Sequence, residues 1–514
     1  MNCIEPERCP PTRGPRTWTM PRWRRDSGGH GFALPWRTQH PGDLVSASRL
    51  VGIVWGAVAI SACTGVRPDA RSDVTGRWEG TASLFGASAP LTVDIAPDGD
   101  SLRAVVTMNV EALYYDRPLA NMSYRAPRVH FEFASRDGNN GVFDGVLKAD
   151  TIVGVTRKSN RELPMRFVRA SREIPAPPYA RETVRFRAPD GVTLEGTLLV
   201  PKTPGPHPAV IFIHGSGPSE RGDLGHIADK FARRGIAAFA YDKRGSGQSG
   251  GNAEHATYHT FAADAAAAAA ALSRRSGIID PDRIGVLGSS EGGWVAPIVA
   301  TADPRIAFVI GVVAPGTSYA ENGIFQNVKR MEAGGASADE IARYESLIAR
   351  VNSHVRASRA RGQAVPDSAT TARLQRALDS TSQLAWRRFV DLPRRVPAGR
   401  DFARLRWQML DFDPLPYWSR VRAPVMVALG ANDRNVNSAE SVSKIGEALR
   451  AGGNGDYALH VFPRSTHDMM VLPDPAGEFH FPAPPPGYPD TLALWAASKV
   501  GIDVRSADRP SPSR

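Results

Sequence analysis

The sequence predicts an α/β domain, with a mostly parallel sheet and helices on both faces, preceded by a small antiparallel β-domain. Short apolar runs alternate with helical segments over residues 183–315 and again over 419–505, which is the pattern of βαβ units. Between them, residues 316–418 lose this alternation; helical spacing with many arginines over 338–358 and 372–391, and a further helix over 400–409, predict a helical cap inserted into the domain. Residues 75–172 instead alternate with period two between turn signals, as antiparallel strands do.

Composition limits the classes of protein that fit. The 514 residues exceed what one hydrophobic core usually organises, and 42% hydrophobic with 22% charged residues is typical of a globular protein. The net charge is +11, but the first 49 residues hold eight Arg against four acidic residues, and elsewhere Arg is scattered. Without a basic run interleaved with aromatic residues, we expect no nucleic-acid partner. The three cysteines are Cys3, Cys9 and Cys63, so the rest of the chain offers neither a disulfide framework nor a cysteine-based metal site.

The N-terminal residues 1–62 are predicted to be a disordered extension followed by a signal peptide. Arg49 precedes an apolar run, residues 50–62, that is too short to span a bilayer and ends in small residues. Ile60-Ser61-Ala62-Cys63 resembles a bacterial lipobox. This resemblance implies secretion across the inner membrane, a lipid on Cys63, a tether over 63–74 and a cell-envelope location. The alternative is a signal peptide or signal anchor whose cysteine is incidental.

The β-domain over residues 75–172 carries its apolar residues on one face of each run. Examples are Leu91, Val93 and Ile95, and the turn Asp98-Gly99 follows them. Gly76-Arg77-Trp78-Glu79-Gly80 resembles the Gly-x-Trp opening of lipocalin-like barrels. No residue pattern here indicates catalysis, so we expect a packing or substrate-rim module, with a small-ligand barrel as the alternative. Residues 173–182 form a Pro-rich linker.

The strongest functional signal lies between residues 283 and 294. Ile284 to Leu287 is a short apolar run that predicts a buried strand, and Trp294 and its followers predict a helix. Between them, Gly288-Ser289-Ser290-Glu291-Gly292 fits G-x-S-x-G, which in this strand–turn–helix context predicts a nucleophilic serine at Ser290. Glycines relieve the crowding of such a strained turn, and the helix N-terminus directs N–H groups at a developing oxyanion.

A serine hydroxyl needs a base and a group that orients the base. His467 follows the last predicted strand and is the expected base; His480 competes but lies in a Pro-rich segment. Asp433, in the loop after the strand Val425–Leu429, is the expected acid, and Asp456 and Asp468 are the alternatives.

Two backbone amides are predicted to form the oxyanion hole. One is the N–H of Glu291, which follows the nucleophile, and the other lies in the loop that begins at His214. There we expect the Ser216 N–H, with Gly215 as its possible replacement. We expect His214 to shape its own loop and Arg244 to brace the loop that carries it.

Five motifs occur in order: His214-Gly-Ser-Gly-Pro, Asp242-x-Arg-Gly-x-Gly-x-Ser, Gly288-x-Ser-x-Gly-Gly, Gly430-x-x-Asp-x-x-Val and the late His467. Together they resemble the α/β-hydrolase superfamily over about residues 183–500, near its bacterial serine esterases with an N-terminal β-domain, the dienelactone hydrolases and the prolyl-oligopeptidase-type peptidases. The resemblance implies the α/β-hydrolase fold and hydrolysis of carboxylic esters with short to medium acyl chains, without metal or cofactor. Dienelactone hydrolases commonly use a cysteine nucleophile, so Ser290 argues against that branch.

The predicted activity is therefore that of a serine esterase that acts on a small-molecule ester through an acyl-enzyme. The alternatives are a serine peptidase of prolyl-oligopeptidase type, a thioesterase, and a non-catalytic ligand-binding or envelope scaffold protein. A prolyl-oligopeptidase-type enzyme usually carries a large propeller, which about 100 residues of β-structure cannot supply.

Overall fold

The computed structural model describes residues 73–84, 87–108, 117–133, 140–159, 161–170, 177–361, 368–472 and 483–503. The predicted signal peptide, Cys63 and most of its tether lie outside the described residues, and so do His480 and residues 173–176 of the Pro-rich linker. None of the helices in the described part combines the length and the apolar character that a membrane span requires.

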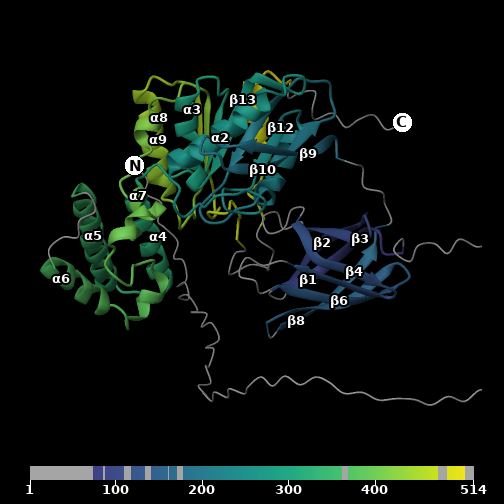
Figure 1. The fold of residues 1–514 in the computed structure, drawn as a ribbon, viewed down its shortest axis with the longest axis horizontal. Coiled ribbons are helices and arrows are strands. Elements are labelled where there is room, and N and C mark those ends of the chain that lie inside the picture. Colours follow the sequence, from purple (N-terminus) through teal and green to yellow (C-terminus); the bar gives the residue numbers. More distant parts are fainter. Residues whose placement is uncertain are drawn as a thin grey trace, which may run out of the picture. The chain divides into compact units, whose positions relative to one another are not determined.

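The N-terminal β-domain is a closed antiparallel barrel in which each strand pairs with the next and β8 closes on β1 (Figure 1). The apolar face predicted from period two is its core: Leu91, Val93 and Ile95 are buried. The Phe131 and Phe143 rings stack at 4.4 Å inside it. The strands are β1 Gly76–Leu84, β2 Ala87–Asp98, β3 Ser101–Met108, β4 Arg117–Arg125, β5 Arg128–Phe133, β6 Gly141–Lys148, β7 Thr151–Lys158 and β8 Arg161–Arg169.

The second sheet has eight strands in the order β16-β15-β14-β13-β11-β12-β10-β9. Strands β11 to β16 run parallel to one another, while β10 pairs antiparallel with both β12 and β9. Every residue of β11, β12, β14 and β15 is buried, which explains their uninterrupted apolar sequences. The strands are β9 Tyr179–Arg187, β10 Thr193–Pro201, β11 His207–Ile213, β12 Ala237–Tyr241, β13 Ile279–Ser289, β14 Val309–Val312, β15 Val425–Gly430 and β16 Tyr457–Phe462.

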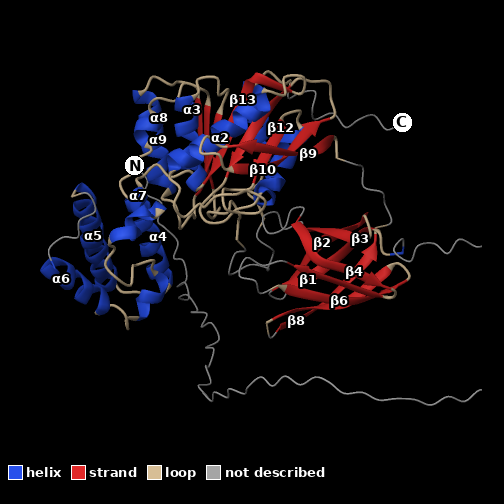
Figure 2. Ribbon diagram, in the orientation of Figure 1, coloured by secondary structure: helices blue, strands red, loops and turns tan. Residues whose placement is uncertain are grey.

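Helices cover both faces of this sheet (Figure 2). Helices α2 and α3 contact each other and β13, α8 contacts both α3 and α9, and α1 contacts α10 and β12. Their bounds are α1 Gly225–Arg233, α2 Tyr258–Ser273, α3 Glu291–Ala302, α9 Ser438–Ala451 and α10 Asp490–Lys499, and a short 3₁₀ helix, η2 Arg221–Leu224, precedes α1.

The segment between β14 and β15 is helical, as its sequence predicts, but its helices differ from the predicted ones. The first, α4, was not predicted. The helix predicted over 372–391 is α6 followed by a separate 3₁₀ turn, because Thr381 and Ser382 bond back to the end of α6 and stop it. The helix predicted over 400–409 is likewise a 3₁₀ turn followed by a single α-turn. The elements are α4 Tyr319–Ala333, α5 Ala338–Ala360, α6 Ser368–Asp379, η3 Ala385–Phe389, η4 Gly399–Ala403, α7 Leu405–Gln408 and α8 Leu415–Trp418.

This cap has its own hydrophobic core, in which Tyr344, Val351 and Trp386 are fully buried. It also contacts the sheet domain directly. The Leu405 N–H donates to the Glu254 carbonyl at 2.7 Å, and several cap residues line a cavity that reaches Ser290.

Candidate active site

Ser290 occupies a strained turn between β13 and α3. Its φ of 53° and ψ of −113° lie in a region that residues with a side chain rarely adopt. The flanking glycines are required by close approach: a Cβ on Gly288 would lie 2.0 Å from the Gly292 carbonyl oxygen, and one on Gly292 would lie 2.3 Å from that of Ile213. The predicted strand, turn and helix are therefore present, and they hold the hydroxyl at the carboxyl edge of the sheet.

The loops after β15 and β16 bring two further side chains to this serine. The His467 Nε2 lies 2.9 Å from the Ser290 Oγ, although the two residues are 177 positions apart. The His467 Nδ1 lies 2.8 Å from the Asp433 Oδ2. A carboxylate only accepts hydrogen bonds, so Nδ1 carries the proton and Nε2 is left to accept the serine hydroxyl.

Asp433 is fixed by its own loop. Its Oδ1 accepts the backbone N–H groups of Asn435 at 2.7 Å and Val436 at 2.9 Å, which leaves Oδ2 for the imidazole. The other acids considered from the sequence are used differently: Asp456 pairs with Lys499 at 2.5 Å, and Asp468 is exposed next to the histidine. The geometry thus joins Ser290, His467 and Asp433 in one chain of hydrogen bonds.

The two amides predicted for the oxyanion hole lie beside the serine. Ser216 and Glu291 line the same cavity as Ser290, and a Cβ on Gly215 would contact the Ser290 Cβ at 3.4 Å. Within the described part of the chain, neither the Ser216 N–H nor the Glu291 N–H donates a hydrogen bond. Glu291 is also the first residue of α3, where the helix dipole favours negative charge. Both N–H groups are available to a developing oxyanion.

A buried ion pair that sequence reasoning missed lies next to these two amides. The Lys243 ammonium donates to the Glu291 carboxylate at 2.5 Å and to the Gly215 carbonyl at 2.8 Å, and both side chains are at most 6% exposed. Burial raises the pKa of the Glu291 carboxyl, and the Lys243 ammonium opposes that rise without cancelling it. The sequence offered only two separate signals, an acid next to the nucleophile and a lysine in the Asp242–Ser249 loop. That these two side chains form a pair is visible only in the folded structure.

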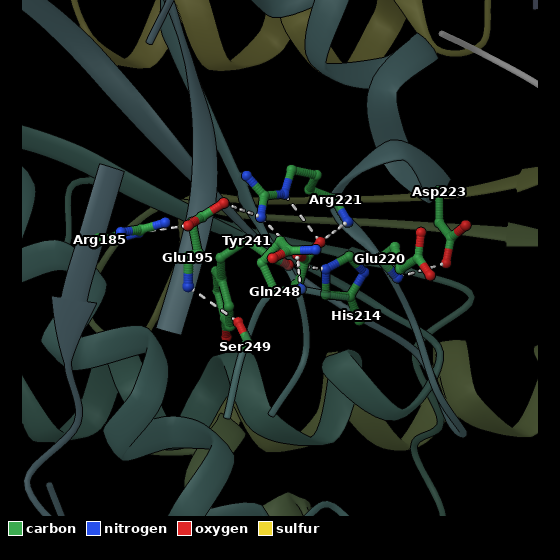
Figure 3. A network of polar contacts seen from close by, with 10 residues as sticks. Arg185, Glu195, His214, Glu220, Arg221, Asp223, Tyr241, Gln248 and Ser249 are labelled. Atoms are coloured by element: carbon green, nitrogen blue, oxygen red, sulfur yellow. Dashed lines mark hydrogen bonds and ion pairs between the residues drawn. The ribbon is translucent and has the colours of Figure 1, made fainter. Parts of the chain in front are cut away.

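The loop that begins at His214 is held by a polar network (Figure 3). The His214 Nε2 bonds to the Tyr241 carbonyl, and burial lowers the pKa of this histidine, so the ring is neutral. Arg221 holds Asp242 at 2.6 Å and Glu195 at 2.8 Å. Burial alone would raise the pKa of Asp242, but the hydrogen bonds from Arg221 outweigh it and the pKa is lowered. His214 thus has the loop-shaping contact that the sequence predicted.

Arg244 braces the loop that carries it, residues 242–249. Its guanidinium makes two hydrogen bonds to Asp264, at 3.0 and 2.6 Å, and one to Asp190 at 2.7 Å. The two bonds to Asp264 are buried, whereas Asp190 is 48% exposed, and together they agree with the predicted bracing role. No group of three or more His, Cys, Asp or Glu in the described ranges is arranged to hold a metal ion.

Two cavities open on the serine. The first, of about 270 Å³, extends into the cap, and the second, of about 410 Å³, contains His467. They share four lining residues, which are Ser216, Ser290, Gln326 and Arg330. Gln326 and Arg330 belong to α4, the helix that the sequence did not predict, so sequence reasoning missed the cap wall of the site.

With this geometry established, comparison with known proteins gives the family. A family model described as "Alpha/beta hydrolase family" matches residues 210–480, which is more than half of the chain. The chain belongs to the alpha/beta hydrolase family. The catalytic domain thus has the fold that the five sequence motifs implied, and its members' shared chemistry makes a hydrolase the expected class of enzyme.

Individual relatives match only part of the chain. It is 34% identical over 150 residues to the polyketide transferase ATR5 of Stachybotrys chlorohalonatus, covering 29% of this chain and 48% of that protein. It is 29% identical over 129 residues to the thiohydrolase aneE of Aspergillus aculeatus, covering 25% and 40%. The chain thus spans about half the length, or less, of these curated relatives. A solved structure of a Mycobacterium tuberculosis puromycin-hydrolyzing peptidase aligns with a TM-score of 0.43 and 17% identity, over 82% of this chain and 55% of that one.

Proposed function

We propose that this protein is a serine hydrolase that cleaves carboxylic esters through an acyl-enzyme on Ser290. The observation that supports it most is the continuous contact from the Ser290 Oγ to the His467 imidazole at 2.9 Å and on to the Asp433 carboxylate at 2.8 Å. Ser290 lies at a strained turn, and the two available N–H groups lie beside it. A hydroxyl in that setting has the base, the orienting acid and the oxyanion donors that acyl transfer needs.

The reaction follows from this geometry. The Ser290 Oγ attacks the ester carbonyl while the His467 Nε2 accepts its proton, and Asp433 stabilises the imidazolium that results. The carbonyl oxygen, now negative, accepts hydrogen bonds from the Ser216 and Glu291 N–H groups. When the C–O bond to the leaving group breaks, His467 returns the proton to the departing alcohol. Water then enters, gives a proton to His467 and attacks the acyl-enzyme, which releases the acid and restores the serine.

A thioesterase is the second candidate, because one curated relative is named a thiohydrolase. The same steps would release a thiol in place of an alcohol. A prolyl-oligopeptidase-type peptidase has less support, since a single eight-stranded barrel stands where such enzymes usually carry a propeller.

The test combines active-site labelling with substrate comparison. We expect a fluorophosphonate probe to label the wild-type protein at Ser290 and the Ser290→Ala variant to lose the label and at least about 10⁴-fold in kcat. The p-nitrophenyl esters, acyl thioesters and aminoacyl anilides should be compared on the same preparation, and kcat/KM should be highest for the oxygen esters. Labelling that survives Ser290→Ala would contradict the assignment of the nucleophile.

We also propose that the mature protein is a lipoprotein tethered to a cell-envelope membrane through Cys63. The support is the order of Arg49, a short apolar run and the small residues before the cysteine. Expression in a bacterium with labelled fatty acid should label the wild-type protein and leave Cys63→Ala unlabelled. Equal labelling of both would contradict the proposal.

A further inference from the structure

The cap cavity contains buried amide side chains that the protein itself does not use. Asn322 on α4 and Asn352 on α5 are each only 5% exposed, and both line the cavity that reaches Ser290. In the described part of the chain neither side chain makes a hydrogen bond, and the Asn322 Oδ1 is a buried atom without a partner. Leaving a buried polar group unpaired is unfavourable, so such groups call for an explanation.

A third asparagine in the same wall shows that the cap can satisfy an amide when its role is structural. Asn327 donates to the Tyr344 hydroxyl at 2.7 Å and accepts the Asp391 N–H at 3.1 Å. Asn322 and Asn327 lie on the same helix and are buried to the same degree, yet only Asn327 is paired. Asn322 and Asn352 both line the cavity, so a ligand bound there can hydrogen-bond to their amide groups.

A cation stands at the mouth of this cavity. Asn322, Gln326 and Arg330 follow one another at four-residue spacing, so they form one row along α4. Arg330 has no carboxylate within ion-pair distance among the described residues; its nearest side-chain contact is Asn327 at 3.4 Å. The other cavity arginine, Arg406, is already paired with Asp391 at 3.2 Å. The cavity thus carries one uncompensated positive charge.

The position of the base indicates which half of the substrate meets this wall. His467 lines the second cavity and not the first, and it must protonate the leaving group. The leaving group therefore departs on the His467 side, and the acyl group, on the opposite side of the scissile carbonyl, extends into the cap cavity.

We propose that the preferred substrates are esters whose acyl chain carries hydrogen-bonding groups and a distal carboxylate. Asn322 and Asn352 would bind the polar groups of the chain, and the Arg330 guanidinium would bind the carboxylate. This inference rests on the proposed function and narrows it from short and medium acyl chains in general to polar, anionic ones.

Three substrates of equal acyl length test it: p-nitrophenyl hexanoate, p-nitrophenyl methyl adipate and mono-p-nitrophenyl adipate. The first is apolar, the second is polar and neutral, and the third is polar and anionic. We expect kcat/KM to rise in that order, by about tenfold between the neutral and the anionic adipate. Rates are corrected for the uncatalysed hydrolysis of each ester.

Two variants separate the two parts of the wall. Arg330→Gln should reduce the anionic-over-neutral ratio to about one. Asn322→Leu should instead reduce the preference for methyl adipate over hexanoate. Arg343→Gln is the matched control, because Arg343 is an exposed cap arginine that lines neither cavity at Ser290, and it should change no ratio.

The outcomes distinguish this inference from the function on which it rests. If no ester is hydrolysed and the fluorophosphonate does not label Ser290, the proposed function fails. If labelling is normal but wild-type protein hydrolyses hexanoate at least as well as the adipates, the acyl assignment is wrong. A ratio unchanged by Arg330→Gln, with normal labelling, would overturn the role of the arginine.

Discussion

The two walls of the active site differ in whether their polar side chains have partners within the protein. The catalytic floor, made of the loops at 214–217, 242–249 and 288–292 with His467 and Asp433, pairs its buried charges. Lys243 meets Glu291, Arg221 meets Asp242, and the imidazole uses both of its nitrogens. The cap wall, made of Asn322, Gln326, Arg330 and Asn352, leaves the Asn322 and Asn352 amides without a hydrogen bond and the Arg330 cation without a carboxylate partner in the described structure. A group that must stay in place is held by the protein, whereas a group that meets a substrate is left open to it.

The largest effect is expected where the floor orients the base. Replacing Asp433 by Asn should lower kcat by about 10⁴-fold, because an amide no longer requires the proton on the His467 Nδ1. Steady-state hydrolysis of a p-nitrophenyl ester measures this. Asp456→Asn is the control, since that carboxylate is 55% exposed and pairs with Lys499 away from the site. A loss below tenfold for Asp433→Asn would mean that the acid is not Asp433.

The second-largest expected effect tests whether Lys243 and Glu291 stabilise the fold as a pair. Lys243→Met leaves the Glu291 carboxylate buried without its cation, which should lower the free energy of unfolding by about 3–5 kcal/mol near neutral pH. The double variant Lys243→Met/Glu291→Leu should recover most of this loss. Chemical denaturation of the three proteins measures it, and a double variant no more stable than the single one would argue against the pair.

The stability lost in the Lys243→Met variant should increase as the pH rises. The folded pKa of Glu291 is raised above its ordinary value by burial, and removing Lys243 raises it further. The stability of the Lys243→Met variant is therefore fully present below the unfolded pKa and falls as the pH rises through the folded pKa. We expect the variant to differ less from the wild type at pH 4.5 than at pH 8.

A smaller effect compares a paired amide with an unpaired one. Asn327→Leu removes the hydrogen bonds to Tyr344 and Asp391 and should destabilise the cap by about 2 kcal/mol. Asn322→Leu removes an amide with no partner and should change stability by less than about 0.5 kcal/mol. Thermal unfolding of both variants checks the difference. Equal losses would show that Asn322 is a structural residue and would remove the contrast between the two walls.

The smallest expected effect concerns His226, which lines the second cavity together with His467. Burial, with help from the Lys230 ammonium, lowers the pKa of His226 to about 4, so the folded protein holds this ring neutral. Its contribution to stability is present above the ordinary pKa of about 6.5 and is lost as the pH falls from there towards 4. Because the ring is partly exposed, His226→Gln should reduce this acid-induced loss by only about 1 kcal/mol. Denaturation at pH 7 and pH 4.5 measures it; identical pH profiles would contradict the burial of the charge.

Residues whose roles depend on neighbours in sequence were predictable. The turn at Ser290 follows from a strand, two glycines and a helix within twelve residues, and Gly288 is explained by a clash with Gly292 inside that turn. Asp433 and His467 each follow a strand, and parallel strands end at the same edge of a sheet, so their meeting could be expected. The period-two runs of the β-domain likewise predicted its core.

Residues whose roles depend on contacts across the fold were not. Lys243 and Glu291 are 48 positions apart, and no sequence motif indicates that they pair. Helix α4 was missed because its cavity-facing row is polar, which weakens the apolar periodicity that identifies a helix. The helices predicted over 372–391 and 400–409 are interrupted at residues 380–384 and 404. These interruptions depend on local backbone hydrogen bonds that the sequence pattern does not reveal.

By itself, the sequence determined the class of fold, the strand, turn and helix that carry Ser290, and the three side chains that meet at the edge of the sheet. These follow from local periodicity and from turns whose residues permit few conformations. Only the tertiary structure decided which buried charges neutralise each other and which amides remain unpaired beside the serine. Hydrogen-bond satisfaction is a property of three-dimensional surroundings, and the same asparagine can be a brace or a substrate contact depending on what faces it.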